Sequence, residues 1–305
     1  MCNDVRRSML QAVLAGVLVF AATASMAAEK VFDRSFSVKP DGQLTVTADG
    51  AGISVVGGDA NQVVVHIVAK ASQKELDEMT FAASQTDGGV TVELRRPERR
   101  NWLGWGSSDM DARIEVKVPR TYRVEAKTSG GDMRLEQVAG PSRLRTSGGG
   151  IVIKNLKGDI EGNTSGGDVH LESIDGLVRV HTSGGGIHAE SVRGDIDANT
   201  SGGDVRLVRI DGKIRASTSG GNVQCELVGA NRGISATTSG GDVRLTMPKN
   251  TSGTLDAQSS GGEVVTDFPV ATTRTGEHRL SGPINGGGEA IYARTSGGNI
   301  KLTAQ

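Results

Sequence analysis

Residues 164–181 decide the fold, and they read Thr-Ser-Gly-Gly-Asp-Val-His-Leu-Glu-Ser-Ile-Asp-Gly-Leu-Val-Arg-Val-His. Apolar and polar residues alternate in two segments, Asp168–Ile174 and Leu177–Thr182, which an Asp-Gly turn at 175–176 separates. A period of two is typical of a β-strand with one buried face. The unit therefore predicts two strands joined by turns, and no helix fits it.

The motif Thr-Ser-Gly-Gly that opens this unit recurs along the chain. It begins at Thr128, Thr146, Thr164, Thr182, Thr200, Thr218, Thr238 and Thr295, with a Ser-Ser-Gly-Gly variant at Ser259. The first five intervals are identical, and the next two are slightly longer. A fixed period of this kind indicates stacked supersecondary units. We expect Gly166 and Gly167 to form a tight corner with positive φ angles.

The alternation assigns a face to each side chain. The inward residues are Val169, Leu171, Ile174, Val178, Val180 and Thr182, followed in the next unit by Ile187, Ala189, Val192, Ile196, Ala198 and Thr200. Small inward residues imply a narrow, flattened core between two sheets. Cys225 falls in the inward column of Leu171 and Leu207, so we expect a small core residue rather than a nucleophile.

Outward residues that lie one repeat apart support direct stacking of successive coils. One column reads Arg143, Glu161, Arg179, Asp197 and Arg215; a second reads Lys157, Asp175, Arg193 and Asp211; and the residue after Gly-Gly runs Asp132, Gly150, Asp168, Gly186, Asp204, Asn222 and Asp242. In a parallel stack such neighbours lie ~4.8 Å apart, where opposite charges are favourable. Duplication of an ancestral two-unit segment would leave the same alternation. We predict an all-β parallel β-solenoid (β-helix) with about 18 residues per coil, in which Arg179 lies between Glu161 and Asp197.

The composition agrees with a thin β-coil. The 305 residues include 44 glycines but only 3% aromatic residues, so the bulky anchors of an ordinary globular core are missing. Collagen is excluded because there are only 7 prolines and glycine does not recur at every third residue. The formal net charge of −1 gives no electrostatic basis for binding nucleic acid.

Residues 1–27 have the pattern of a secretory signal peptide. Arg6 and Arg7 precede an apolar run from Met9 to Ala22, and small residues follow it. We expect cleavage after Ala27 and export to the periplasm, the cell surface or the extracellular space. A retained anchor is the alternative, although a span needs about 20 apolar residues. We expect no transmembrane segment in the mature chain. Since Cys2 leaves with the signal peptide, no intramolecular disulfide is expected.

Three further regions follow. Residues 28–127 are expected to form a β-rich N-terminal cap with irregular first coils, residues 128–262 the regular solenoid, and residues 263–305 degenerate C-terminal coils. The strands expected in the cap are Val31–Val38, Gln43–Ala48, Gly52–Val56, Val63–Ala69, Val90–Leu94 and Ile114–Val118. A short helix is expected within Ser72–Phe81, and Asn299–Leu302 is expected to be the closing strand.

The third residue after Gly-Gly, in the first strand of each repeat, contributes to a weakly basic stripe. Its members are Arg134, Val152, His170, His188, Arg206, Gln224 and Arg244. His170 and His188 are expected to be neighbours, but the sequence offers no convincing third ligand. We therefore expect solvated strand residues here and no metal site.

The segment between Arg95 and Asp111 gathers cationic and aromatic residues, and it contains both tryptophans of the chain. Exposed Trp and Arg are typical binding anchors. The candidate contacts for a glycan, a lipid headgroup or a protein partner are Arg99, Arg100, Trp102 and Trp105. A hairpin loop whose tryptophans fold back onto the cap is the alternative.

Residues 113–132 (Arg-Ile-Glu-Val-Lys-Val-Pro-Arg-Thr-Tyr-Arg-Val-Glu-Ala-Lys-Thr-Ser-Gly-Gly-Asp), the repeated Thr-Ser-Gly-Gly-Asp-Val units and residues 243–249 (Val-Arg-Leu-Thr-Met-Pro-Lys) carry a resemblance. The chain resembles a bacterial putative-adhesin family of exported β-solenoid proteins, related to the head-GIN adhesin-like domains. The likeness covers most of residues 30–305. It implies an exported or envelope-associated adhesin, and it supplies no catalytic residues.

Together, the residues and the resemblance predict a non-enzymatic, adhesin-like structural or binding protein that presents a solenoid surface in the cell envelope. A polysaccharide-active β-helix enzyme, a lyase or a hydrolase, is the alternative, but the outward acids are spread along the coils rather than gathered on one face. A calcium β-roll would need the motif Gly-Gly-x-Gly-x-Asp in every half-coil, and the repeat does not supply it. We expect no catalytic residue, no cofactor and no metal. The expected partner is an envelope glycan or a protein, and no oligomeric state follows from the sequence.

Overall fold

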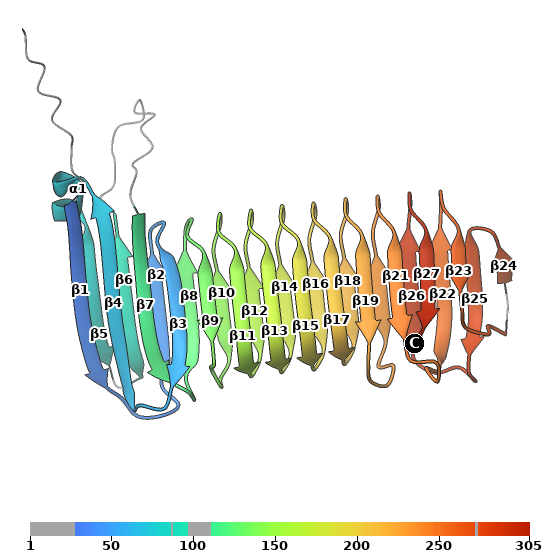
Figure 1. The fold of residues 1–305 in the computed structure, drawn as a ribbon, viewed down its shortest axis with the longest axis horizontal. Coiled ribbons are helices and arrows are strands. Elements are labelled where there is room, and N and C mark those ends of the chain that lie inside the picture. Colours follow the sequence, from blue (N-terminus) through green and yellow to red (C-terminus); the bar gives the residue numbers. More distant parts are fainter. Residues whose placement is uncertain (1–27, 87, 97–110, 272–273) are drawn as a thin grey trace, which may run out of the picture.

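The chain winds into two long β-sheets that face each other along an extended rod (Figure 1). The computed structural model describes residues 28–86, 88–96, 111–271 and 274–305. Within them, sheet A has 13 strands, sheet B has 14 strands, and the one helix is α1 (Gln73–Glu78). None of the described residues forms a helix long and apolar enough to cross a bilayer.

The strands of each sheet follow one another along the rod. Sheet A runs in the order β1 (Ala28–Ser37), β4 (Gln62–Ala71), β7 (Asp111–Pro119), β3 (Gly52–Gly58), β9 (Met133–Glu136), β11 (Ile151–Lys157), β13 (Val169–Asp175), β15 (Ile187–Arg193), β17 (Val205–Asp211), β19 (Val223–Leu227), β21 (Val243–Met247), β27 (Ile300–Ala304) and β23 (Val264–Thr266). Sheet B runs, from the same end, in the order β5 (Thr80–Thr86), β6 (Gly89–Arg95), β2 (Gln43–Ala48), β8 (Arg123–Thr128), β10 (Ser142–Arg145), β12 (Ile160–Asn163), β14 (Val178–His181), β16 (Ile196–Asn199), β18 (Ile214–Ser217), β20 (Ile234–Thr237), β26 (Ala290–Thr295), β22 (Gly253–Ser259), β25 (Arg279–Ile284) and β24 (Arg274–Gly276).

Successive coils stack in the predicted register. Strands β13 and β15 pair in parallel, as do β14 and β16, and each residue faces its equivalent one repeat later. Arg179 faces Glu161 on one side and Asp197 on the other. In the same column, Arg143 Nε lies 2.8 Å from Glu161 Oε2. The β-solenoid with its predicted coil length is therefore confirmed.

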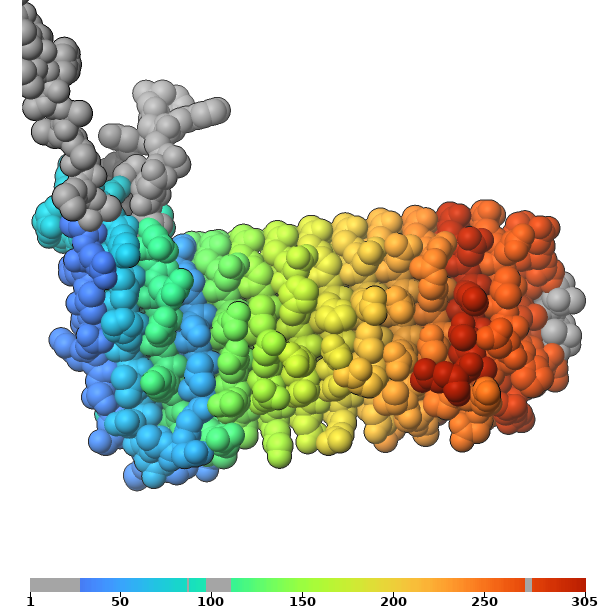
Figure 2. All heavy atoms as spheres, in the orientation of Figure 1, coloured from blue at the N-terminus to red at the C-terminus, as the bar shows by residue number. Residues whose placement is uncertain are grey.

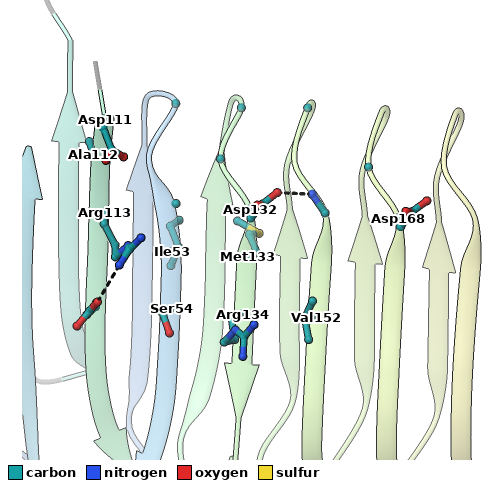
Figure 3. A pocket seen from close by; sticks show the side chains of 18 of the residues that line it. Ile53, Ser54, Asp111, Ala112, Arg113, Asp132, Met133, Arg134, Val152 and Asp168 are labelled. Carbon is teal, nitrogen blue, oxygen red and sulfur yellow. Dashed lines mark hydrogen bonds and ion pairs between the residues drawn. The ribbon is translucent and has the colours of Figure 1, made fainter. Parts of the chain in front are cut away.

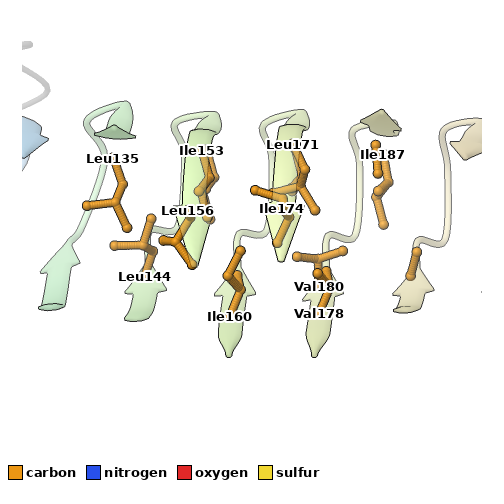
Figure 4. Packing of buried hydrophobic residues seen from close by; sticks show 14 of the residues in the cluster. Leu135, Leu144, Ile153, Leu156, Ile160, Leu171, Ile174, Val178, Val180 and Ile187 are labelled. Carbon is orange, nitrogen blue, oxygen red and sulfur yellow. The ribbon is translucent and has the colours of Figure 1, made fainter. Parts of the chain in front are cut away.

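The inward residues of the repeat form a thin core between the sheets (Figure 4). All twelve side chains predicted to point inward are buried. Leu171 and Ile174 both point inward, although they are three positions apart, because Ser173 adopts a left-handed conformation with φ 58°. The left-handed residue interrupts the alternation and bends the strand locally, as in a β-bulge. Glu172 and Ser173 therefore both face outward.

The glycine pair of the repeat has a different role from the predicted one. Neither Gly166 nor Gly167 has a positive φ angle, so that expectation is wrong. A Cβ on Gly167 would lie 2.2 Å from the carbonyl oxygen of Gly149 in the preceding coil, whereas a Cβ on Gly166 would lie 3.2 Å from the Gly148 oxygen. The second glycine is thus required by the close approach of two backbones. Among the glycines of this repeat, the positive φ angle occurs at the other turn, at Gly176 (φ 155°).

The buried threonine of the motif joins neighbouring coils. The hydroxyl of Thr164 donates to the carbonyl of Gly149 at 2.7 Å and accepts the backbone N–H of Gly167 at 3.3 Å. The same bond to the preceding coil is made by Thr146, Thr182, Thr200, Thr218, Thr238 and Thr295. Since a buried polar group needs a partner, these bonds explain why an inward position carries threonine.

Both ends of the rod depart from sequence order. The last strand, β27, lies between β21 and β23, so the expectation that Asn299–Leu302 closes the stack is wrong. In Figure 2 the final residues form a dark-red band with orange residues on both sides. At the other end, β2 and β3 lie between the coil of β6 and β7 and the coil of β8 and β9. Which strands stack depends on pairing between distant segments, which alternation does not encode.

The N-terminal region contains all six strands expected from the sequence, together with the short helix. Helix α1 is held by a capping box between Ser72 and Glu75. Strand β5 is additional to the expected strands, because its residues follow the helical pattern without clear alternation. It pairs antiparallel with β6, while β4 and β1 extend sheet A by antiparallel pairing.

Candidate functional site

The candidate contacts marked by the sequence cannot be placed on the fold. All four, Arg99, Arg100, Trp102 and Trp105, lie outside the described residues. The preceding arginine, Arg95, is described, and its Nε lies 3.1 Å from Glu93 Oε2. The backbone N–H of Arg96 donates to Asp49 at 3.0 Å. The chain then resumes at Asp111, the first residue of β7.

A shallow groove crosses the outer face of sheet A near this point (Figure 3). Its largest section has a volume of about 890 Å³ and passes over β7, β3, β9, β11 and β13. Two further sections, of about 430 and 280 Å³, share His170 with the first and extend the groove as far as Arg244 on β21. The groove therefore runs along the rod, across successive strands.

Three of the acidic residues that follow Gly-Gly line the groove, namely Asp132, Asp168 and Asp204. Oδ1 of Asp132 accepts the backbone N–H of Gly150 in the next coil at 2.8 Å, as Figure 3 shows. Asp168 binds the N–H of Gly186 in the same way at 2.7 Å. The ladder continues through Asp204, Asn222, Asp242 and Asn299. Each Asp or Asn of the ladder thus binds a backbone N–H of the next coil. This bond is a second role for these residues, besides keeping like charges apart in neighbouring coils.

The predicted basic stripe also lines the groove. Its residues face one another in register from Arg134 to Arg244. His170 and His188 are neighbours, with ring centroids 6.0 Å apart. Partial burial, aided by the nearby His170 and Arg206, lowers the pKa of His188. No group of three or more His, Cys, Asp or Glu side chains with metal-binding geometry occurs among the described residues.

Several outward carboxylates are paired with arginine. The hydrogen bond from Arg145 is the main cause that holds the pKa of Glu161 below its ordinary value, and Arg143 adds to it. The hydrogen bond from Arg209 similarly lowers the pKa of Glu190. A general acid needs a raised pKa to stay protonated near neutral pH. These pairs therefore favour ionised, structural carboxylates.

Cys225 is the small core residue that the sequence predicts. It lies in β19 with 2% of its surface exposed and pairs in register with Leu207 and Leu245. Burial raises the pKa of its thiol to about 12. A buried, protonated thiol is not a nucleophile.

Comparison with solved structures returns long but distant matches. A putative adhesin from Bacteroides fragilis is 13% identical, with a TM-score of 0.43, over 90% of this chain and 97% of that one. A putative lipid binding protein from Parabacteroides distasonis is 13% identical, with a TM-score of 0.36, over 89% and 96% of the two chains. A putative cell adhesion protein from Clostridium sporogenes is 11% identical, with a TM-score of 0.24, over 90% and 100%. At these identities and scores the likeness does not extend to what those proteins bind.

No curated protein matches the sequence. The family model described as Toastrack DUF4097 matches residues 42–303, which is most of the chain and includes the whole repeat region. The resemblance drawn from the Thr-Ser-Gly-Gly units is thereby confirmed, while the relation to the head-GIN domains stays a prediction. The chain belongs to the Toastrack DUF4097 family.

Proposed function

We propose that this is an exported, non-enzymatic, adhesin-like protein that binds a component of the cell envelope through the outer face of sheet A. The observation that carries this proposal is the groove, which follows the rod over nine neighbouring strands from β7 to β21. Eight steps of ~4.8 Å give it a length of roughly 38 Å. An extended, shallow groove suits a long ligand better than a small molecule, which prefers a deep and mostly apolar pocket.

The use of the acids supports a non-enzymatic role. Polysaccharide hydrolysis needs a pair of carboxyl groups that can act on one bond. In the groove, Asp132, Asp168 and Asp204 each hold a backbone N–H of the next coil. One oxygen of each carboxylate is thus used in the stacking of the solenoid, and the three carboxylates are distributed along it rather than paired.

Export rests on the character of residues 1–27, which have a basic start, an apolar run and small residues before Ala28. We further propose that Arg99, Arg100, Trp102 and Trp105 contribute contacts to the envelope ligand. Their place in the chain supports this, because the segment ends at Asp111, which lines the groove.

The test is co-sedimentation of the full chain with a purified envelope fraction. The groove variant is Arg206→Ala with Gln224→Ala, which face each other on sheet A. The matched control is Arg215→Ala with Ser235→Ala, which face each other on sheet B in the same two coils. We expect the groove variant to lose most of its binding and the control to keep it. The quadruple alanine variant at Arg99, Arg100, Trp102 and Trp105 tests the second contact.

Two results would overturn the proposal. One is a chain that stays in the supernatant, or that binds equally well in both variants. The other is the release of new sugar ends from a polysaccharide by the purified chain, which would make it the polysaccharide-active enzyme.

A further inference from the structure

Acidic and cationic side chains form pairs that recur at every second coil along the groove. Each pair consists of an Asp directly before a strand of sheet A and the Arg or His two positions later, in that strand. The four pairs are Asp132 with Arg134, Asp168 with His170, Asp204 with Arg206, and Asp242 with Arg244. The intervening coils carry Gly150 with Val152, Gly186 with His188, and Asn222 with Gln224 at these positions, so an acid occurs in every second coil only.

Three of the four acids are fixed in place with one free oxygen, whereas Oδ2 of Asp242 accepts a hydrogen bond from Arg244. In Asp132, Asp168 and Asp204, Oδ1 accepts a backbone N–H at 2.8, 2.7 and 2.6 Å, which sets the orientation of the carboxylate. Oδ2 of these three residues forms no hydrogen bond with any residue that the structure describes. All three side chains are exposed. Each therefore offers a preoriented acceptor to a ligand, and ordering it on binding costs little.

The neighbouring cation supplies the matching donors in the two central pairs, whereas Arg134 is bonded to Glu136 and Arg244 to Asp242. Arg206 is exposed and makes no hydrogen bond or ion pair with a described residue. His170 likewise faces outward beside Asp168. A hydroxyl group both donates and accepts a hydrogen bond. An Asp acceptor next to an Arg or His donor therefore matches adjacent hydroxyl groups of a sugar.

The charge of the groove disfavours binding of a polyanion. The residues that line its three sections include seven carboxylates but only five Lys and Arg side chains. A nucleic acid or a uronic-acid polymer would meet net repulsion there, because such ligands need an excess of cations. A neutral ligand rich in hydroxyl groups meets no such penalty.

The spacing of the pairs matches a linear ligand. Two coils advance roughly 9.6 Å, twice the ~4.8 Å between neighbouring strands. An extended β-linked disaccharide has about this length, so a straight glycan would present equivalent hydroxyl groups to successive pairs. From the fixed carboxylates, the paired donors, the charge and the spacing, we infer that the groove binds a linear, neutral, β-linked polysaccharide, one disaccharide for every two coils. This inference rests on the proposed binding role of sheet A.

The experiment measures binding of the full chain, by isothermal titration calorimetry, to neutral β-1,4-linked hexasaccharides of glucose, mannose, xylose and N-acetylglucosamine. A hexasaccharide covers three consecutive pairs of the four, so it always meets Asp204 and Arg206. We expect at least one of the four sugars to bind, its disaccharide to bind more than tenfold more weakly, and hexagalacturonate to bind more weakly than the neutral sugar. Arg206→Ala should weaken binding about tenfold, while Arg215→Ala, on sheet B of the same coil, should not change it.

A second variant separates ligand contact from stability. Asp168→Asn keeps an oxygen for the Gly186 N–H but removes the charge, so we expect the melting temperature to be kept and the affinity to fall. Equal affinities for Arg206→Ala and Arg215→Ala, or a preference for hexagalacturonate, would overturn the inference. If none of the four neutral sugars binds but the envelope fraction does, the inference fails and the proposed function stands. If neither binds, both fail.

Discussion

The hydroxyl of Thr164 donates a hydrogen bond to the carbonyl oxygen of Gly149, one coil earlier, at 2.7 Å, and this bond recurs along the solenoid. The backbone N–H of Gly167 completes the arrangement by donating to the same hydroxyl at 3.3 Å. One buried side chain thus satisfies a carbonyl of one coil and an N–H of the next at the Gly-Gly corner.

Removing that hydroxyl should destabilise the stack. Thr164→Val keeps the shape but leaves the Gly149 carbonyl and the Gly167 N–H without this partner, at a cost of about 1–3 kcal/mol. The measurement is the midpoint of denaturant unfolding. Thr164→Ser, which keeps the hydroxyl, is the control and should lose less. Equal losses in both variants would show that the methyl group, and not the bond, matters at this site.

The two glycines of the motif should differ in how much an alanine substitution destabilises the fold. In Gly167→Ala the new Cβ would lie 2.2 Å from a backbone oxygen that cannot move away without separating the coils, so we expect a loss of about 3 kcal/mol. In Gly166→Ala the nearest atom is 3.2 Å away, and the expected loss is below about 1 kcal/mol. Thermal melting of the two variants makes the comparison. Similar melting temperatures would contradict the role assigned to the second glycine.

Glu161 should titrate below its ordinary pKa of 4.5 in the folded chain, chiefly because Arg145 donates a hydrogen bond to it. A carboxyl whose pKa is lowered by folding stabilises the fold above its unfolded pKa. That stabilisation is lost as the pH falls through the folded pKa. Since the pair is largely solvent-exposed, the effect should not exceed about 0.5 kcal/mol. An NMR titration of the carboxyl should show the pKa rising more in Arg145→Ala than in Arg143→Ala, and the reverse order would refute the assignment.

The Cys225 thiol should be inert in the folded protein. Its side chain is 2% exposed, and burial raises its pKa to about 12. In a Cys2→Ser background, we expect an aromatic disulfide reagent to leave the native chain unmodified at pH 8 and to react fully once the chain is unfolded. Rapid reaction of the native chain would place this cysteine at the surface.

The regular part of the fold can be predicted from the sequence because the features that determine it, alternation within a strand and a constant repeat length, are local. Alternation places Val169 and Leu171 inward, and the constant repeat length sets which residues face each other. The ends do not follow, because β2 and β27 insert between strands that are distant in the chain. Long-range strand pairing of this kind is set by the whole stack and not by any one segment.

The sequence predicts only some of the residues that form the groove. The basic stripe can be found from its spacing, whereas the acids beside it read only as a pattern that avoids like charges. Their second role is to bind the backbone N–H one coil later, which Asp132 does at Gly150 and Asp204 does at Asn222. Because the residue that follows one coil later varies, the sequence contains no signal for this bond, which is recognised only in three dimensions.

The most direct test of the account is to block one face of the rod at a time. Single cysteines are introduced at Val152, in the groove, and at His181, which lies on the outer face of sheet B, in a Cys2→Ser background where Cys225 is shielded. Each is coupled to a bulky maleimide polymer, and binding to the envelope fraction is measured by co-sedimentation. We predict that the polymer at position 152 abolishes binding and that the polymer at position 181 leaves it unchanged. Binding that survives at position 152, or is lost only at position 181, would contradict the assignment of the ligand to sheet A.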